Sequence, residues 1–181
     1  TGLLENPRVK AVFGLHLWPG LEKGRVFSRR KELMARASEV NLDFYGKSSH
    51  IAKAAEGVDA LMAGAEFYTR AMEMERQIPV GIFRLLKFGK FHSGTVRNAL
   101  SAHTHLEGSL RAFQDETFEA MAGSLHRIAG DVQEKYGCDV KLHIAGGYPA
   151  VLNPEALAAR VLEIAPYRVL SEPSMTAEDF S

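Results

Sequence analysis

The sequence has 181 residues, of which 46% are hydrophobic and 24% are charged, which is the composition of an ordinary globular protein. Its 22 basic and 22 acidic residues balance to a net charge of zero, which argues against the basic surface of a nucleic-acid-binding protein. A single cysteine, Cys138, rules out an internal disulfide framework, and no apolar run has the length of a membrane span. We therefore expect a cytoplasmic protein whose partners include neither nucleic acid nor a membrane.

The first apolar segment is "AVFGLHLWPG", residues 11–20, which predicts a short buried strand ended by Pro19 and Gly20. His16 lies in the middle of this segment and has two interpretations. It is either a core histidine with one hydrogen bond or a metal ligand at the carboxyl end of a buried strand. The local sequence leaves both open.

The next elements predict a strand, a helix and a second strand. Apolar and polar residues alternate over residues 38–45, as expected for a half-buried strand. Apolar residues then recur at helical spacing from Gly57 to about Met74, and Pro79 closes this helical region. Residues 82–91 form an apolar strand with more hydrophobic residues than one helix layer covers, so we expect this edge strand to pair with a second copy.

The second half repeats the order of strand and helix. Residues 101–113 alternate strictly, with polar and charged side chains on one face of the predicted strand. Asp115 and Glu116 open an amphipathic helix, where acidic residues favour the positive end of the helix dipole, and Gly137 is suited to ending it. A last strand covers residues 140–144.

Strand, helix, strand, strand, helix, strand is the order of the ferredoxin-like (βαββαβ) two-layer sandwich, an α+β fold, which we place at residues 34–145. Residues 1–33 and 146–181, the latter with a helix in "NPEALAARVLEIA", have the pattern of parts of another domain into which the sandwich is inserted. We expect the chain to be an internal fragment of a longer protein, because it starts without methionine and stops at a turn-like cluster.

Four kinds of side chain are candidates for a site. His50, in the turn "KSSH", is either a polar loop residue or a donor placed at a cleft. Asn98, after a Gly-Thr turn, and Arg111, on the open face of a strand, have the donors to hold a carboxylate. His103, His105 and Glu107 share one strand face and resemble a metal-binding set, although a solvated sheet face explains them equally simply and is the interpretation we prefer.

Motifs along nearly the whole chain, in order, resemble those of one enzyme family. They are "GLLENPRVKAVFGLHLWPGLEKGRV", "GKSSHI", "SGTVRN", "EGSLRAF", "GGYP" and "MTAEDF". The family is that of the hippurate hydrolase-like N-acyl-amino-acid amidohydrolases, relatives of aminoacylase and carboxypeptidase G that include N-acetyl-diaminopimelate deacetylase. The resemblance implies a metal-dependent enzyme that cleaves the amide bond of N-acyl amino acids or small peptides.

The resemblance also implies roles for individual residues. His16 would bind metal, in a site that holds two divalent ions (Zn, Mn, Co or Ni) in the full-length enzyme. His50 would donate to the tetrahedral oxyanion, and Asn98 and Arg111 would hold the substrate carboxylate or nearby polar groups. The ferredoxin-like insert would be a lid and homodimerisation domain, which in some members carries its histidine into the partner's active site.

The sequence also departs from the family pattern. Ser48 and Ser49 replace the glycines before the lid histidine, Ala54 and Ala55 replace a Pro-His pair, and "NALSA" replaces "NVIPD". The family's general-base glutamate and its other metal ligands match no residue of this chain, so we expect the fragment alone to be inactive and to hold no metal well. The alternative is a stand-alone dimerisation or small-molecule-binding module of ferredoxin-like fold without catalysis.

Overall fold

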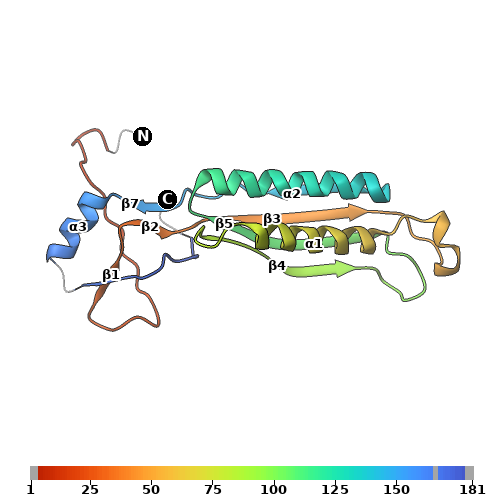
Figure 1. Ribbon diagram of the computed structural model, residues 1–181, viewed down its shortest axis with the longest axis horizontal. Helices are drawn as coiled ribbons and strands as arrows, with labels where there is room; N and C mark the ends of the chain where they lie inside the picture. Colours follow the sequence, from red (N-terminus) through yellow and green to blue (C-terminus); the bar gives the residue numbers. More distant parts are fainter. Residues whose placement is uncertain (1–3, 165–166, 178–181) are drawn as a thin grey trace.

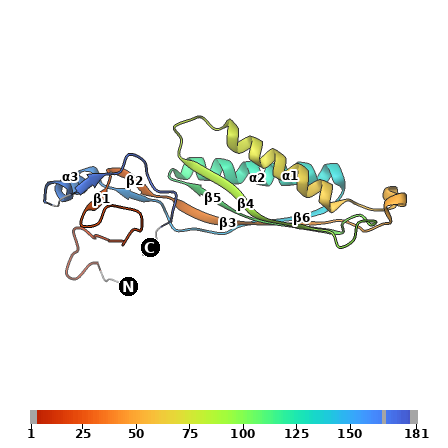
Figure 2. The ribbon, with the colours of Figure 1, turned by 90° about the horizontal axis from the view of Figure 1, so that it is seen from below.

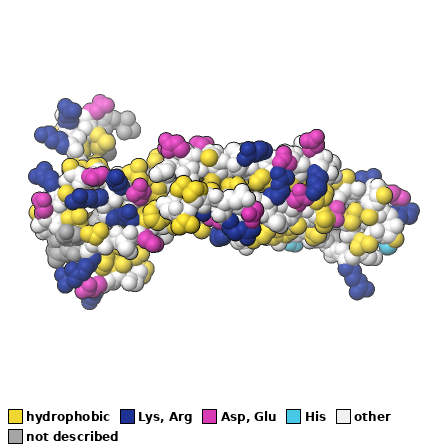
Figure 3. Space-filling view, viewed as in Figure 1, with side chains coloured by type: hydrophobic (Ala, Val, Ile, Leu, Met, Phe, Trp, Pro, Cys, Tyr) yellow, Lys and Arg dark blue, Asp and Glu magenta, His cyan; other side chains and the backbone are white. Residues whose placement is uncertain are grey.

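The computed structural model describes residues 4–164 and 167–177. The molecule is elongated, with a long two-layer sandwich at one end and a smaller flank made from the two ends of the chain at the other (Figure 1). On the face seen in Figure 3, side chains of both charge signs are interspersed along the molecule. Within the described part of the chain, no helix is long and apolar enough to cross a membrane.

The sandwich has the predicted βαββαβ order. Its elements are β3 (Arg36–Tyr45), α1 (Ala60–Gln77), β4 (Arg84–Ser93), β5 (His103–Ala112), α2 (Asp115–Tyr136) and β6 (Asp139–Ile144). The strands form one antiparallel sheet in the order β4-β5-β3-β6. Both helices cover the same face of this sheet and leave the other face bare (Figure 2). The predicted ferredoxin-like fold is confirmed.

Period-two alternation explains which face of the sheet is buried. On β3, Val40, Leu42 and Phe44 point under the helices and are fully buried, whereas the residues between them point to the open face. The helices contribute a matching apolar stripe, which removes nonpolar surface from water. The largest fully buried side chains of the core are Phe44, Phe67, Leu42, Leu86, Leu106, Leu110, Met121, Leu125, Val40 and Val132.

The helix ends follow local chemistry. The carboxylate of Asp59 accepts hydrogen bonds from the backbone N–H groups of Leu61 and Met62, so α1 begins at Ala60, later than the predicted Gly57. Helix α2 begins at Asp115 as predicted. It ends at Gly137, whose φ of +64° is a left-handed conformation that costs glycine little.

The flank is built from segments far apart in the sequence. Strand β1 (Val26–Ser28) pairs in parallel with β8 (Tyr167–Val169), and β2 (Lys31–Met34) pairs antiparallel with β7 (Val151–Asn153). Helix α3 (Glu155–Ile164) joins β7 to β8 and matches the predicted C-terminal helix. These pairings hold the two ends of the chain together beside the sandwich.

The prediction of a buried strand at residues 11–20 is wrong. This segment has no strand, and its apolar side chains are exposed, with Phe13 at 64%, Leu15 at 81% and Leu17 at 100% of their maximal exposure. A continuous apolar run is buried as a strand only where neighbouring strands and helices cover both faces. In the described structure no such element packs on it. Part of the "MTAEDF" match, residues 178–180, lies outside the described residues.

Candidate functional site

His50 and Asn98 lie together at the tip of the sandwich farthest from the flank. The short 3-10 helix η1 (Ile51–Glu56) follows His50, and residues 94–102 form the loop between β4 and β5. The Ile51 N–H donates to the Asn98 carbonyl at 3.1 Å, and the Leu100 N–H donates to the Ser49 carbonyl at 2.8 Å. Two segments that are 48 positions apart in sequence are thereby joined, and both candidate side chains are exposed there.

A cluster of hydroxyl groups anchors the loop that carries Asn98. The Ser93 hydroxyl lies 2.8 Å from that of Ser101 and 2.6 Å from that of Thr104. Ser101 in turn donates to the His103 carbonyl at 2.7 Å. Ser101 and Thr104 are buried, and these bonds satisfy their hydroxyls. No local sequence pattern predicts this cluster, because only the β4–β5 register brings Ser93 and Thr104 opposite each other.

Ser49, one of the two serines that replace the family's glycines, packs against Gly57 in this turn, with its Oγ buried and without a hydrogen-bond partner among the described residues. A Cβ on Gly57 would lie 2.5 Å from the Ser49 Oγ and 2.7 Å from the Lys47 carbonyl oxygen. The absence of a side chain at Gly57 therefore makes room for Ser49. His50 keeps a defined backbone conformation with φ −63° and ψ 138°.

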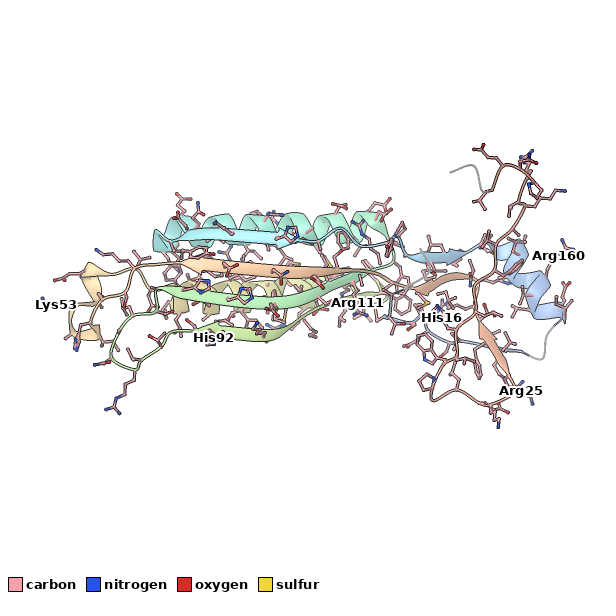
Figure 4. The ribbon with its side chains drawn as sticks, turned by 180° about the vertical axis from the view of Figure 1, so that it is seen from behind. His16, Arg25, Lys53, His92, Arg111 and Arg160 are labelled. Carbon is pink, nitrogen blue, oxygen red and sulfur yellow. The ribbon has the colours of Figure 1, made fainter. Side chains whose placement is uncertain are left out.

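Arg111 lies at the other end of β5, where the sandwich meets the flank (Figure 4). Its Nη1 donates to the Met175 carbonyl at 2.5 Å, and its Nε donates to the Ser109 hydroxyl at 3.2 Å. The flank thus orients the guanidinium, which is half-buried. A residue so held presents its remaining donors in a fixed direction.

The structure therefore divides the candidate residues between two ends. Figure 4 shows Lys53, three residues after His50, at one extremity, whereas His16 and Arg111 lie toward the flank. From His103 at the tip end of β5 to Arg111, an antiparallel strand rise of about 3.4 Å per residue gives a span of roughly 27 Å. His50 and Asn98 of one chain cannot meet Arg111 and His16 of that chain around one small substrate.

Among the residues that the structure describes, His16 is not part of a group arranged to bind a metal ion. It lies in the exposed segment 11–20, with the Trp18 ring edge-on at a centroid distance of 6.3 Å. Among the described residues, no group of three or more His, Cys, Asp or Glu side chains is arranged to hold a metal ion. One imidazole holds a divalent ion poorly, since protein metal sites use three or four ligands. The residues present do not fit the implied metals by themselves.

The structure agrees with the preferred interpretation of His103, His105 and Glu107: they form hydrogen bonds on the open sheet face, and no group of described residues there is arranged to bind a metal ion. One carboxylate oxygen of Asp43 lies 2.8 Å from both the His103 Nε2 and the His105 Nδ1. The His105 Nε2 lies 2.9 Å from Glu107, which also accepts from Lys90 at 2.6 Å. Asp43 was not a candidate from the sequence. Side chains alternate between the two faces along β3, which places Asp43 on the open face. Only the register between β3 and β5 brings it opposite His105.

Glu107, His105 and Asp43 form a row on the open sheet face in which each carboxylate lies beside the imidazole, and these contacts shift the pKa values of the row. His105 has a carboxylate at each ring nitrogen, so the protonated ring can donate to both. The hydrogen bond to Glu107 and then that to Asp43 raise the pKa of His105, against the effect of burial. Burial alone would raise the pKa of Asp43, but hydrogen bonds from His103 and His105 outweigh it and lower that pKa.

Comparisons with known proteins point to one group of enzymes. N-acetyldiaminopimelate deacetylase of Limosilactobacillus fermentum is 32% identical over 99% of this chain and 49% of its own length. The deacetylase of the same name from Lacticaseibacillus paracasei is 30% identical over 95% of this chain and 47% of its own length. The chain spans about half the length of the curated relatives it matches. A scan against protein-family models finds no match.

Solved structures agree with the fold. A putative aminohydrolase from methicillin-resistant Staphylococcus aureus superposes with a TM-score of 0.81 at 22% identity, over 91% of this chain and 44% of that one. The YXEP protein of Bacillus subtilis, described as a dinuclear metal binding peptidase of the M20 family, has a TM-score of 0.71 at 23% identity, over 99% of this chain and 45% of its own. The sandwich and its flank are therefore a known arrangement.

Proposed function

Because this chain belongs to the amidohydrolase family that includes the N-acetyldiaminopimelate deacetylases, we propose that the protein containing it hydrolyses the amide bond of N-acyl amino acids to a carboxylic acid and a free amino acid. Residues 34–145 serve as the lid and dimerisation domain, and residues 1–33 and 146–181 belong to the catalytic domain. The observation that carries the proposal is the pairing of His50 and Asn98 at one tip, in the order and at the positions of the family's lid motifs.

The roles follow from the charges that develop during hydrolysis. Water adds to the amide carbon, the carbonyl oxygen takes up negative charge, and the C–N bond then breaks as the amine takes a proton. A donor aimed at that oxygen stabilises the transition state, which is the role of His50. Asn98 and Arg111 bind the substrate carboxylate or neighbouring polar groups, since the guanidinium fork matches a carboxylate. His16 is one proposed ligand of a metal centre, to which we assign no step.

Because the two ends of the sandwich lie far apart, we propose a dimer in which each active site takes residues from both subunits. His50 and Asn98 of one subunit act in the site that holds His16 and Arg111 of its partner. The span of roughly 27 Å along β5 supports this arrangement over one within a single chain.

Subunit mixing tests the proposal in the full-length protein. His50→Ala and His16→Ala dimers are each expected to be inactive, and their equimolar mixture to regain roughly a quarter of wild-type turnover, because half of the dimers then hold one intact site of two. A mixture of His50→Ala with Asn98→Ala is the matched control. Both changes are on the same tip, so no intact site forms and no activity returns. Equal recovery in both mixtures, or recovery in neither, would contradict shared sites.

A further inference from the structure

The ring of His50 is held by a backbone group. The Ala52 N–H donates to the His50 Nδ1 at 3.1 Å, so the imidazole caps the short helix η1. A neutral imidazole has one N–H donor and one bare acceptor nitrogen. Since Nδ1 accepts this hydrogen bond, the ring proton lies on Nε2. The Nε2–H is then the only ring group that can donate to a ligand.

The backbone on both sides of His50 is fixed as well. The Lys53 N–H donates to the His50 carbonyl at 2.7 Å, and the Ile51 N–H donates to the Asn98 carbonyl at 3.1 Å. His50 and Ala99 form an isolated antiparallel bridge. The ring is thus attached to a frame that includes Asn98, and its direction relative to that residue is set before any substrate binds. A donor fixed in this way has little reorganisation to undergo during the reaction.

We propose that the Ala52 backbone N–H is the positioning group for the lid histidine: it selects the Nε2–H tautomer of His50 and aims that N–H outward from the tip. The proposal rests on the proposed function only for the use of this donor, which is to bind the developing oxyanion. The tautomer itself is a property of the turn. Ala52 contacts no substrate and acts through His50.

Removal of a single N–H tests this step. Ala52→Pro deletes the donor in the first turn of a helix, where proline is tolerated. Ala52→Val is the matched control, because it adds bulk to the same site and keeps the N–H. Both are made in the full-length protein labelled with 15N-histidine, and the His50 signals are identified as those missing from His50→Asn.

At alkaline pH, where imidazoles are neutral, the 15N shifts report which ring nitrogen carries the proton. We expect wild type and Ala52→Val to show a bare Nδ1 and a protonated Nε2, and Ala52→Pro to show a mixture of both tautomers. The kcat of Ala52→Pro should fall about fivefold relative to Ala52→Val, the effect of one lost hydrogen bond, with KM changing less.

A wild-type protein with its proton on Nδ1, or identical 15N shifts in the two Ala52 variants, would overturn the proposal. Failure of the proposed function has a different signature. In that case His50→Ala leaves kcat unchanged while the wild-type 15N shifts still report the Nε2–H tautomer.

Discussion

At the scale of single residues, we propose different roles for Arg111 and His50, namely carboxylate binding and donation to the oxyanion. Arg111 is oriented by the Met175 carbonyl and the Ser109 hydroxyl, whereas the His50 ring accepts a hydrogen bond from the Ala52 N–H at the opposite tip. Carboxylate binding is shared by the ground state and the transition state, but oxyanion donation acts chiefly in the transition state. Substitution of Arg111 should therefore change mainly KM, and substitution of His50 should change mainly kcat.

We predict that Arg111→Ala in the full-length enzyme raises KM for an N-acyl amino acid about 10- to 100-fold with a smaller change in kcat, because a charged hydrogen bond is lost. His50→Ala should instead lower kcat about 100- to 1,000-fold. Steady-state kinetics of both variants measure the split, and Arg111→Lys, which keeps the charge without the fork, should be intermediate. A fall in kcat alone for Arg111→Ala would remove it from carboxylate binding.

At the scale of secondary-structure elements, close packing of α1 on the sheet depends on Gly64. A Cβ there would lie 2.5 Å from the Thr104 Cγ2 of β5. We expect Gly64→Ala to lower the free energy of unfolding by about 1–3 kcal/mol through overpacking. Gly123 of α2 is the matched control, because a Cβ there meets nothing within 4 Å. Gly123→Ala should raise stability by up to about 1 kcal/mol. Urea denaturation of both variants measures the difference, and two shifts of the same sign would refute it.

The Asp43–His105–Glu107 row joins β3 to β5, and it makes stability depend on pH. Because the folded-state pKa of His105 is raised, its contribution is fully present below the ordinary histidine pKa of about 6.5 and is lost as pH rises through the higher folded value. The gain is small, since these exposed and partly exposed groups are screened by water.

We therefore predict that the free energy of unfolding falls more steeply between about pH 6 and 8 in wild type than in His105→Gln. Chemical denaturation across this range measures it. His143→Gln, on the same open face of β6, is the control and should keep the wild-type slope. If His105→Gln kept that slope too, the row would contribute nothing to pH-dependent stability.

At the scale of the whole molecule, we propose that one side of the sandwich binds a second copy. β4 is an edge strand of the sheet, and beside it a groove of about 290 Å³ lies between α1 and β4, lined by residues that include Tyr68, Met72 and Lys87. Tyr68 is 40% exposed and packs edge-on against Phe88. Unpaired edges with apolar neighbours favour association.

We predict that Tyr68→Glu weakens the dimer of the full-length protein at least about tenfold, because it removes an exposed aromatic side chain and places a carboxylate beside Phe88. Tyr148→Glu changes a tyrosine that is also exposed but lies before β7, and it should leave association unchanged. Sedimentation velocity over a concentration series compares the two. Dimers of equal strength in both variants would place the interface elsewhere.

The local elements of the sandwich were determined by the sequence alone. Alternation on β3 and β5, the acidic start of α2 and Gly137 at its end predicted the element order and hence the ferredoxin-like fold. These signals are local, because apolar residues recur every 2.0 residues along a strand and every 3.6 residues along a helix when one face of the element is buried. The role proposed for His50 likewise depends on the short motif "GKSSHI".

What the tertiary structure decided is which residues meet. Strand register placed Asp43 between His103 and His105, and loop pairing joined His50 to Asn98 while separating both from Arg111. The apolar run around His16 predicts a buried strand but is exposed, because burial depends on neighbouring elements that the tertiary structure supplies and not on the run itself. Contacts between distant segments follow from chain topology, which local periodicity does not encode.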